Sequence, residues 1–228
     1  MSYSTFLLDL DHTLFDTEAS EVAAFEQTMF AAGVEEPRHY WQDFQNINLE
    51  LWTAVERGEM NPLLLRTLRF ERLVAKFDLG VDPQSMADKY VVGLGAFGDL
   101  YEGAREVLEQ LSERASLAMV TNGLGEVQRS RIARLGLEQF FDAIAISAEI
   151  GAAKPDAGIF DIVFNSLGSE AVASAVMVGD NLSADIRGGA DYGIATCWYN
   201  PHGRTADVQH RIDHEIAELE ELVGLLAH

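Results

Sequence analysis

The stretch FLLDLDHTLFD (residues 6–16) places two carboxylates where a buried strand is expected. Asp9 interrupts an apolar run, and Asp11 follows Leu10 at its end. Burying even a neutral polar group without a partner costs about 2–7 kcal/mol, and an unpaired carboxylate costs more. The position of Asp9 therefore predicts that another part of the fold compensates its charge.

The composition predicts an ordinary globular protein with a strongly acidic surface. The 228 residues are 48% hydrophobic and 9% aromatic, and the formal net charge is −21. This is enough to build one large domain, or a domain with a sizeable insertion. A field of this sign repels nucleic acid and anionic membranes, so we expect neither as a partner. The negative net charge is still compatible with a small anionic substrate if positive charge is concentrated at the binding site.

The sequence has no feature typical of an exported or membrane protein. Its start lacks a basic segment followed by an apolar stretch of signal length, and no run reaches the roughly 18 apolar residues of a membrane span. We therefore expect a soluble, cytoplasmic protein. Cys197 is the single cysteine, and its setting in IATCWYN predicts a packed thiol rather than a reactive one.

Short β-rich runs alternate with segments of helical spacing along most of the chain. The predicted strands are residues 5–11, 115–121, 143–150, 175–180 and 194–200. Such alternation predicts a parallel sheet with helices on both faces. The continuous apolar pattern of LAMV and AVMV is typical of strands buried on both sides. The expected fold class is α/β, with a doubly wound, Rossmann-like core.

Residues 17–99 interrupt this alternation with segments of helical spacing only. We therefore expect two domains: an α/β core of residues 1–16 and 100–228, and an inserted all-helical cap of residues 17–99. The insertion follows the first strand, at the sheet edge where α/β proteins bind ligands. This position predicts a lid.

Residues 93–98, GLGAFG, match the dinucleotide-binding pattern G-x-G-x-x-G. That pattern binds a dinucleotide only between a strand and a helix of a βαβ unit. Here the preceding SMADKYVV has the character of the end of the helical insertion. We interpret the glycines as a flexible return from the insertion to the core.

Four polar motifs follow successive predicted strands. They are Asp9-Leu10-Asp11-His12-Thr13, Thr121-Asn122-Gly123, Lys154-Pro155, and Asp180 with Asp185 in GDNLSAD. Each motif alone has a simple explanation as a turn or a helix cap. Because the strand ends of a doubly wound sheet converge on one crevice, the four together predict a single site.

The residue types of these motifs suit phosphoryl chemistry. Asp9, Asp180 and Asp185 offer the hard oxygen ligands that Mg²⁺ prefers. A carboxylate can also act as a nucleophile and form an aspartyl-phosphate. Thr121 and the main-chain N–H groups after it can hold phosphoryl oxygens, and Lys154 supplies positive charge.

Over nearly the whole chain, these motifs and their order resemble those of the haloacid-dehalogenase-like hydrolases. The resemblance implies that Asp9 is the nucleophile and that Asp11 protonates the leaving alcohol and then activates water. It also implies Mg²⁺ held by Asp9, the main-chain oxygen of Asp11 and Asp180, with Asp185 in support. The dehalogenases of the family lack an acid at the position of Asp11. Its presence indicates the phosphatase branch, because phosphoester cleavage needs a proton donor.

The same resemblance assigns further residues. Lys154 joins the catalytic set, and Thr13, Thr121 and Asn122 contact the phosphate. His12 stands where Gly, Asp, Asn or Glu is usual beside the second aspartate, a position from which its ring could touch the leaving group of the substrate.

A narrower resemblance, to bacterial pyrimidine-nucleotide 5′-phosphatases, rests on residues 48–73, 121–142 and 193–203. Similar stretches also occur in acylneuraminate phosphatases. Within the cap, an aromatic ring of Trp52 or Phe70 could stack on a base, and Arg69 could reach an anion. The alternative is core packing for the two aromatic residues and a solvated position for Arg69.

We therefore expect a Mg²⁺-dependent phosphomonoesterase that acts as a monomer or homodimer on a small phosphorylated metabolite, with a pyrimidine nucleoside monophosphate as the first candidate. The alternatives among enzymes are a phosphatase of a sugar phosphate, phosphoglycolate or acylneuraminate phosphate, and a phosphomutase. A phosphoacceptor signalling domain also combines acids, a threonine and a lysine on such a sheet, but it lacks the inserted cap and the Asp-x-Asp arrangement. A binding protein without catalysis is disfavoured because every expected catalytic group is present.

Overall fold

The computed structural model describes residues 2–206 and 211–227, and these divide into two compact units. The sheet unit takes its described residues from Met1–Asp16, Asp99–Gly125 and Ile132–His228. The helical unit takes them from Thr17–Gly98 and Glu126–Arg131. The chain thus leaves the sheet unit directly after the Asp-x-Asp stretch and returns to it later.

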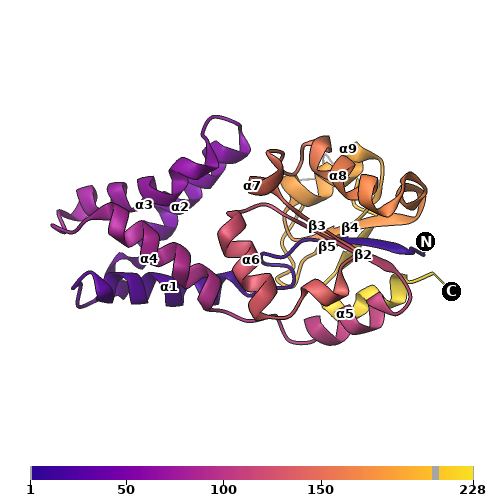
Figure 1. The fold of residues 1–228 in the computed structure, drawn as a ribbon, viewed down its shortest axis with the longest axis horizontal. Helices are drawn as coiled ribbons and strands as arrows, with labels where there is room; N and C mark the ends of the chain where they lie inside the picture. The colour runs from indigo at the N-terminus through magenta and orange to yellow at the C-terminus, as the bar shows by residue number, and fades with distance from the viewer. Residues whose placement is uncertain (1, 207–210, 228) are drawn as a thin grey trace. The chain divides into compact units, whose positions relative to one another are not determined.

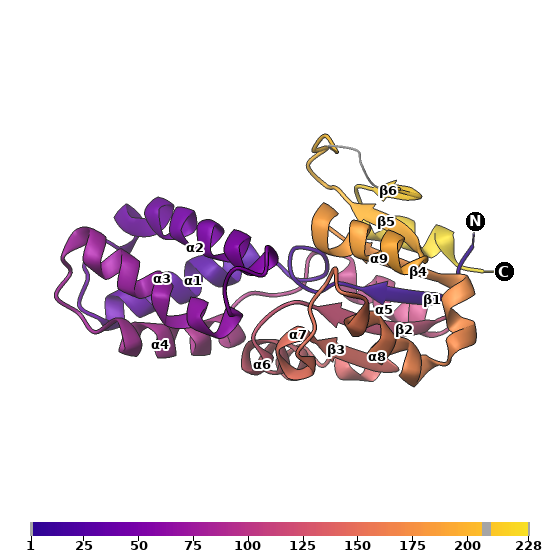
Figure 2. The same ribbon diagram turned by 90° about the horizontal axis from the view of Figure 1, so that it is seen from above.

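The described residues of the sheet unit form a six-stranded sheet in the order β3-β2-β1-β4-β5-β6 (Figure 2). All neighbouring strands are parallel. The strands are β1 (Thr5–Leu8), β2 (Ser116–Thr121), β3 (Ala143–Ile146), β4 (Ala175–Gly179), β5 (Ala195–Tyr199) and β6 (His214–Ile216). The strands β2 and β3 continue from one side of β1, and β4 to β6 from the other. The predicted doubly wound parallel sheet is therefore confirmed.

Helices cover both faces of the sheet (Figure 1). Alternate side chains of the central strands enter two cores, one on each face. On one face Phe6 and Leu8 pack with the side chains of α5 (Ala104–Ser112). On the other face Leu7 packs with those of α8 (Ala157–Leu167). Because both faces are covered, the strands need apolar residues at every position, which explains the continuous apolar runs.

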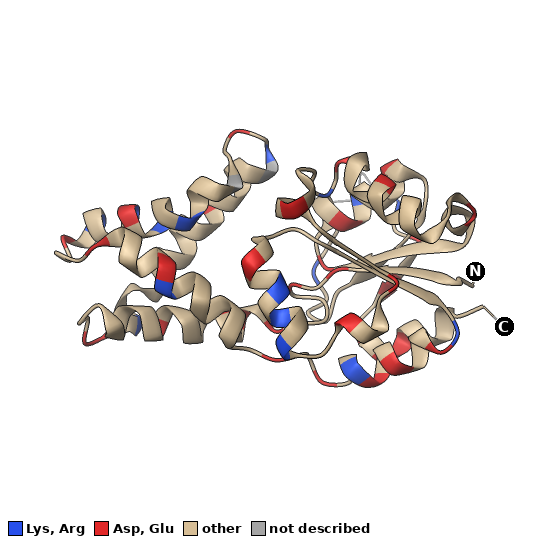
Figure 3. Ribbon diagram, viewed as in Figure 1, with Lys and Arg blue, Asp and Glu red and all other residues tan. Residues whose placement is uncertain are grey.

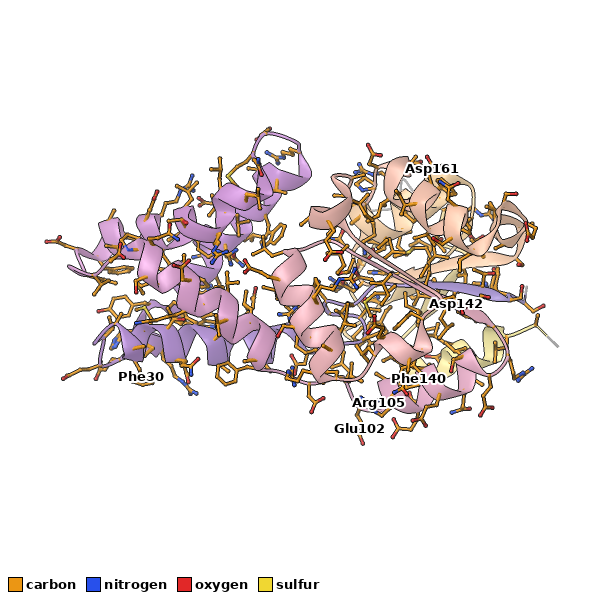
Figure 4. The ribbon with its side chains drawn as sticks, viewed as in Figure 1. Phe30, Glu102, Arg105, Phe140, Asp142 and Asp161 are labelled. Carbon is orange, nitrogen blue, oxygen red and sulfur yellow. The ribbon has the colours of Figure 1, made fainter. Side chains whose placement is uncertain are left out.

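The remaining short elements connect the strands or, in the case of η5, follow the last of them. They are α6 (Gly125–Arg134), η2 (Glu138–Phe140), α7 (Ser147–Ile150), η3 (Ser169–Ser174), η4 (Leu182–Ile186), α9 (Arg187–Tyr192) and η5 (Leu219–Leu225). The guanidinium of Arg105 on α5 lies 5.9 Å from the ring centroid of Phe140 on η2 and donates to the main-chain oxygen of Leu135 at 2.6 Å (Figure 4). These contacts tie the segment after α6 to α5.

Two predicted strands end earlier than expected, and one strand was missed. The predicted strand of residues 5–11 is a strand only to Leu8. The predicted strand of residues 143–150 is a strand only to Ile146, and Ser147–Ile150 form α7. Gly151 ends this helix in the left-handed conformation, at φ 80°. The strand β6 was not predicted, because three residues are too few to show an alternating pattern.

The helical unit contains α1 (Thr17–Ala31), η1 (Pro37–Tyr40), α2 (Trp41–Glu56), α3 (Pro62–Phe77) and α4 (Pro83–Ala96). The helix α1 packs on α4, α4 on α3, and α3 on α2. The side chains of Asn61 and Asp82 cap the first turns of α3 and α4. An aromatic cluster fills the interior, with ring centroids 4.6 to 5.4 Å apart between packed pairs of Phe25, Phe44, Phe70 and Tyr90.

Two of the three glycines of the GLGAFG stretch do not form a flexible return, and for them this expectation was wrong; Gly98 follows α4 with φ 83°, directly before the sheet unit resumes at Asp99. Gly93 and Gly95 lie buried inside α4. A Cβ atom added at Gly93 would lie 2.8 Å from the Cβ of Ala24, and one at Gly95 would lie 2.7 Å from the Oγ of Ser130. The two glycines therefore let neighbouring helices approach α4 closely, at the expense of helix propensity.

The helix α6 begins in the sheet unit, but its residues Glu126–Arg131 belong to the helical unit. Buried Arg131 explains this assignment. Its guanidinium donates to the main-chain oxygen of Leu94 at 2.9 Å and to the Oγ of Ser20 at 3.3 Å. The sequence boundaries of the expected cap did not include this segment, because nothing in the local pattern of α6 marks a long-range contact.

Acidic residues lie on both units, as the net charge requires, while basic residues are fewer and include a group on α6 (Figure 3). Among the described residues, no helix combines the length and the apolar composition that crossing a membrane requires.

Candidate active site

A tight turn follows β1 and presents the Asp-x-Asp motif. The main-chain oxygen of Leu10 accepts hydrogen bonds from the N–H groups of Leu14 and Phe15, both at 3.0 Å. At the tip of this turn, exposed His12 has φ 59°. Gly, Asn, Asp and His tolerate this left-handed conformation better than other residues, which explains why a histidine can stand at this position.

Three carboxylates gather at the carboxyl ends of the neighbouring strands β1 and β4. Asp9 follows β1, Asp180 follows β4, and Asp185 lies on η4. One oxygen from each lies within 4.8 Å of the others. We call these three residues the carboxylate cluster. Asp9 and Asp185 are buried, while Asp11 is half-buried beside them.

Lys154 supplies the compensating charge that the position of Asp9 predicted. Its Nζ lies 2.5 Å from Oδ1 of Asp9 and 2.7 Å from Oδ1 of Asp185, and its side chain is 2% exposed. The side chain of Asn122 holds the main chain of Lys154 from both sides. It accepts from the Lys154 N–H at 2.9 Å and donates to the Lys154 oxygen at 3.0 Å. Lys154 is thus fixed between two carboxylates.

A single lysine does not balance the cluster, as the pKa values indicate. Burial raises the pKa of Asp9 to about 7, with the charges of Asp185 and Asp11 adding to the rise against the opposing charge of Lys154. Burial, followed by the charge of Asp9, raises the pKa of Asp180 to about 6. Burial alone would lower the pKa of Lys154, but the carboxylates of Asp185 and Asp9 outweigh it and raise this pKa. The site therefore carries excess negative charge.

Gly179 makes room for Asp185. A Cβ atom at Gly179 would overlap the carboxylate of Asp185, so no larger residue fits here without displacing it. Oδ1 of Asp185 pairs with Lys154, and its second oxygen, Oδ2, accepts a hydrogen bond from the Asn181 N–H at 3.0 Å. Asp185 is therefore held by Lys154 on one side and by main chain on the other.

Thr13 connects two members of the carboxylate cluster. Its hydroxyl donates to Oδ2 of Asp9 at 3.3 Å and accepts from the N–H of Asp180 at 3.1 Å. Thr121, also predicted to contact phosphate, is buried at the end of β2. The side chain of Asn122 is engaged with Lys154, so a phosphate contact by Asn122 is left to its main-chain N–H. The phosphate contacts of these three residues stay predictions.

The donor set of the cluster fits a hard divalent cation. Carboxylate oxygens are the ligands that Mg²⁺ prefers, and two or more carboxylates with a net negative charge attract it. Burial first, and then repulsion between the carboxylates, raises the pKa values of Asp9 and Asp180, and a bound cation would favour the ionised form of both. Asp185, with its oxygens engaged by Lys154 and Asn181, is suited to a supporting role rather than to direct ligation.

Comparison with known proteins agrees with this arrangement. The family model described as haloacid dehalogenase-like hydrolase matches residues 3–193. The pyrimidine 5′-nucleotidase PynA of Streptococcus pneumoniae is 33% identical, over 99% of this chain and 96% of its own. The pyrimidine 5′-nucleotidase YjjG of Escherichia coli is 30% identical, over 99% of both chains.

The chain belongs to the haloacid dehalogenase-like hydrolase family. Among solved structures, the HAD-hydrolase YfnB of Bacillus subtilis superimposes with a TM-score of 0.92, at 31% identity and covering 99% of both chains. The resemblance stated from the motifs is thereby confirmed, together with the expectation of a hydrolytic enzyme.

In this haloacid dehalogenase-like hydrolase, Trp198 and Arg204 contact Asp180, and Asn200 holds Arg204 in place. None of these three residues was predicted from the sequence. Trp198 Nε1 donates to the main-chain oxygen of Asp180 at 3.0 Å, and Arg204 Nη2 donates to the same oxygen at 2.8 Å. Asn200 holds the main chain of Arg204. The available signal was the polar stretch that directly follows β5, NPHGR (residues 200–204), at a strand end like the motifs after β1 and β4.

The helical unit of this family member gives its candidate leaving-group residues different surroundings. Arg69 is buried, donates from Nε to the Leu65 oxygen at 3.1 Å, and lies 5.3 Å from the ring centroid of Tyr90. The expected alternative, a solvated position, was wrong for Arg69. Phe70 is buried in the aromatic cluster, and Trp52 is half-buried. The leaving-group contacts of His12, Trp52 and Arg69 stay predictions.

Proposed function

We propose that this chain is a Mg²⁺-dependent phosphomonoesterase that acts through an aspartyl-phosphate, with pyrimidine nucleoside monophosphates as its substrates. The observation that carries the proposal is the position of Asp9. It is buried, lies 2.5 Å from Lys154 and 3.3 Å from the Thr13 hydroxyl, and stands two residues before Asp11. The relatives PynA and YjjG are both named pyrimidine 5′-nucleotidases, and this supports the substrate class.

The reaction follows from two carboxyl groups with different surroundings. An oxygen of Asp9 attacks phosphorus, the bond from phosphorus to the ester oxygen breaks, and protonated Asp11 gives its proton to that leaving oxygen. Asp11, now ionised, then takes a proton from a water molecule that attacks the aspartyl-phosphate. Inorganic phosphate leaves and the Asp9 carboxylate is restored. Lys154 keeps Asp9 oriented and offsets its charge throughout.

Asp9, Asp180 and the main-chain oxygen of Asp11 would hold Mg²⁺, with Asp185 in support. When bound, the cation supplies the positive charge that stabilises the phosphoryl oxygens. The Bacillus subtilis relative YfnB was crystallised bound to magnesium, which supports this assignment. Thr121 and the N–H groups after β2 would bind the phosphate oxygens, because they follow the strand next to β1.

We propose that the helical unit acts as a cap. It is inserted eight residues after Asp9, between β1 and the rest of the sheet unit. In such an arrangement, closure excludes water from the site and brings residues of the insertion to the leaving group. His12 and half-buried Trp52 are the candidates for that contact, whereas the burial of Arg69 over Tyr90 favours a packing role.

The decisive experiment compares kcat/KM with Mg²⁺ for UMP, dUMP and dTMP against sugar phosphates, phosphoglycolate and N-acylneuraminate 9-phosphate. The last is included because a human N-acylneuraminate-9-phosphatase is 27% identical over 94% of this chain. We expect the pyrimidine nucleotides to be preferred and inorganic phosphate to be released. Uniformly poor values for nucleotides would refute the pyrimidine assignment alone, and an isomerised ester instead of free phosphate would indicate a mutase.

Asp9→Asn tests the mechanism, with Asp16→Asn as its control. Asp16 is half-buried at the end of the same stretch and is not a member of the carboxylate cluster. We expect Asp9→Asn to lose phosphate release and Asp16→Asn to keep it. An Asp9→Asn protein with full activity contradicts the proposed nucleophile.

A further inference from the structure

We propose that Arg204 is a positioning residue that holds the main chain of Asp180 and thereby aims its carboxylate at the divalent-cation site. Arg204 lies in the connection between β5 and β6, outside the four motifs. The proposal rests on the cation site of the proposed function, and it adds a residue that acts through Asp180 rather than on the substrate.

The backbone of Asp180 is held at both ends. Its N–H donates to the Thr13 hydroxyl at 3.1 Å. Its main-chain oxygen accepts from Trp198 Nε1 at 3.0 Å and from Arg204 Nη2 at 2.8 Å. Because Asp180 follows the last residue of β4, no further strand pairing fixes its position. The side chains of three other segments do this instead.

Arg204 is itself fixed by a buried residue. Asn200, which is 3% exposed, accepts from the Arg204 N–H at 2.8 Å and donates to the Arg204 oxygen at 2.9 Å. Its amide nitrogen also donates to Oε1 of Glu215 on β6 at 2.6 Å. The guanidinium carbon of Arg204 lies 5.6 Å from the ring centroid of Trp198, the other donor to Asp180. Asn200 thus links Arg204 to β6 through Glu215, and the Arg204 guanidinium is presented to Asp180.

The hydrogen bond to the main chain, rather than charge attraction, is the effective contact. The guanidinium is 2.8 Å from the main-chain oxygen of Asp180 but 3.5 Å from its Oδ2. The Arg204 side chain is 49% exposed, so solvent screens its attraction to the carboxylate. A hydrogen bond that fixes the ligand's backbone preorganises the site without neutralising the carboxylate.

The test measures metal binding in the absence of substrate. Calorimetric titration of the full-length protein with Mg²⁺, or Mn²⁺ titration followed by electron paramagnetic resonance, gives the affinity directly. Loss of a group that orients a metal ligand typically weakens binding about 10–100-fold, and we expect about 10-fold for Arg204→Ala. The Mg²⁺ concentration for half-maximal activity should rise by the same factor, while KM for the ester at saturating Mg²⁺ stays unchanged.

Arg211→Ala is the matched control, because Arg211 lies in the same connection and pairs with Asp213 at 2.6 Å. We expect it to leave metal affinity unchanged. Trp198→Phe removes the other donor to the Asp180 oxygen and keeps most of the ring volume, so it should weaken metal binding in the same direction. If Arg204→Ala does not fold, the metal affinity of Trp198→Phe decides whether the hydrogen bonds to the Asp180 oxygen position the metal ligand.

Salt separates positioning from charge. A hydrogen bond to a main-chain oxygen is hardly screened, so the ratio of wild-type to Arg204→Ala affinity should be equal at low and high NaCl. Unchanged or tighter metal binding by Arg204→Ala overturns the proposal. So does a ratio of wild-type to Arg204→Ala affinity that falls to one in high salt. A protein that binds Mn²⁺ but releases phosphate from no ester overturns the proposed function alone. An active enzyme with unaltered metal affinity in both variants overturns this inference alone.

Discussion

Replacing Lys154 with methionine should destabilise the sheet unit strongly when no metal is bound. The substitution keeps the apolar stem and removes one positive charge from two buried carboxylates, which lie 2.5 and 2.7 Å from Nζ. With the lysine side chain 2% exposed, solvent does not screen the loss. Removing one partner of a buried ion pair costs about 3–5 kcal/mol. For an m-value of about 2–3 kcal/mol/M, the urea midpoint then falls by roughly 1.5 M.

The pH dependence of this loss has a definite sign. Without Lys154, the pKa of Asp9 rises further above its value of about 7, so above pH 7 the folded variant binds a proton that the folded wild type lacks. The unfolded chain releases that proton near pH 4 in both proteins. When only the folded state binds a proton, the free energy of unfolding increases as pH falls. The deficit of Lys154→Met should therefore shrink by up to about 1.4 kcal/mol per pH unit from pH 9 to pH 7, and stay constant below.

The assay is urea unfolding in EDTA at several pH values, with Lys76→Met as the control. The pair of Lys76 with Asp43 is equally short, at 2.5 Å, but the two side chains are 53% and 30% exposed. An exposed pair contributes about 0–1 kcal/mol, so this control should change little. The reasoning is refuted if Lys154→Met at pH 9 is as stable as Lys76→Met, or if its deficit grows as pH falls.

Three further outcomes are expected. Gly179→Ala places a Cβ atom on the carboxylate of Asp185, so calorimetry should record a loss of Mg²⁺ affinity of about 10-fold or more, and unaltered binding would contradict the close approach. Gly93→Ala puts a Cβ atom 2.8 Å from α1 and should destabilise the helical unit by about 1–3 kcal/mol in urea unfolding, whereas Gly224→Ala, with nothing within 4 Å, should change stability by less than about 0.5 kcal/mol. Burial raises the pKa of Cys197 to about 12, so Ellman's reagent at pH 8 should label it only after unfolding, and rapid labelling of the folded protein would disprove this.

The sheet and its motifs were predictable because their signals are local. Strands buried on both faces give uninterrupted apolar runs, and parallel strands bring their carboxyl ends to one edge. Asp9, Lys154 and Asp185 therefore came together from positions far apart in the sequence. The anomaly at Asp9 was informative for the same reason, since a carboxylate inside an apolar run requires a partner.

The contacts that refine the site were not predictable, because they join residues through geometry that no short pattern encodes. The bridge that the Thr13 hydroxyl makes between Asp9 and Asp180 was not predicted, and its phosphate contact stays a prediction. Arg204 reaches Asp180 from the connection after β5, where the polar sequence marks a strand end but does not indicate which residue it contacts. The same holds for Gly93, where only the facing helix reveals why a helix interior keeps a glycine.

Stability alone does not explain the carboxylate cluster. Buried ion pairs rarely stabilise a fold more than apolar residues of the same volume, because desolvation offsets their attraction. Here two buried acids, Asp9 and Asp185, share one lysine and Asp180 lies beside them, so the balance is less favourable than for a simple pair. The surroundings nevertheless hold this arrangement in place: Asn122 fixes Lys154, and Gly179 is small enough to admit Asp185. The excess of negative charge at the carboxyl ends of β1 and β4 is what the proposed cation site and the proposed nucleophile require.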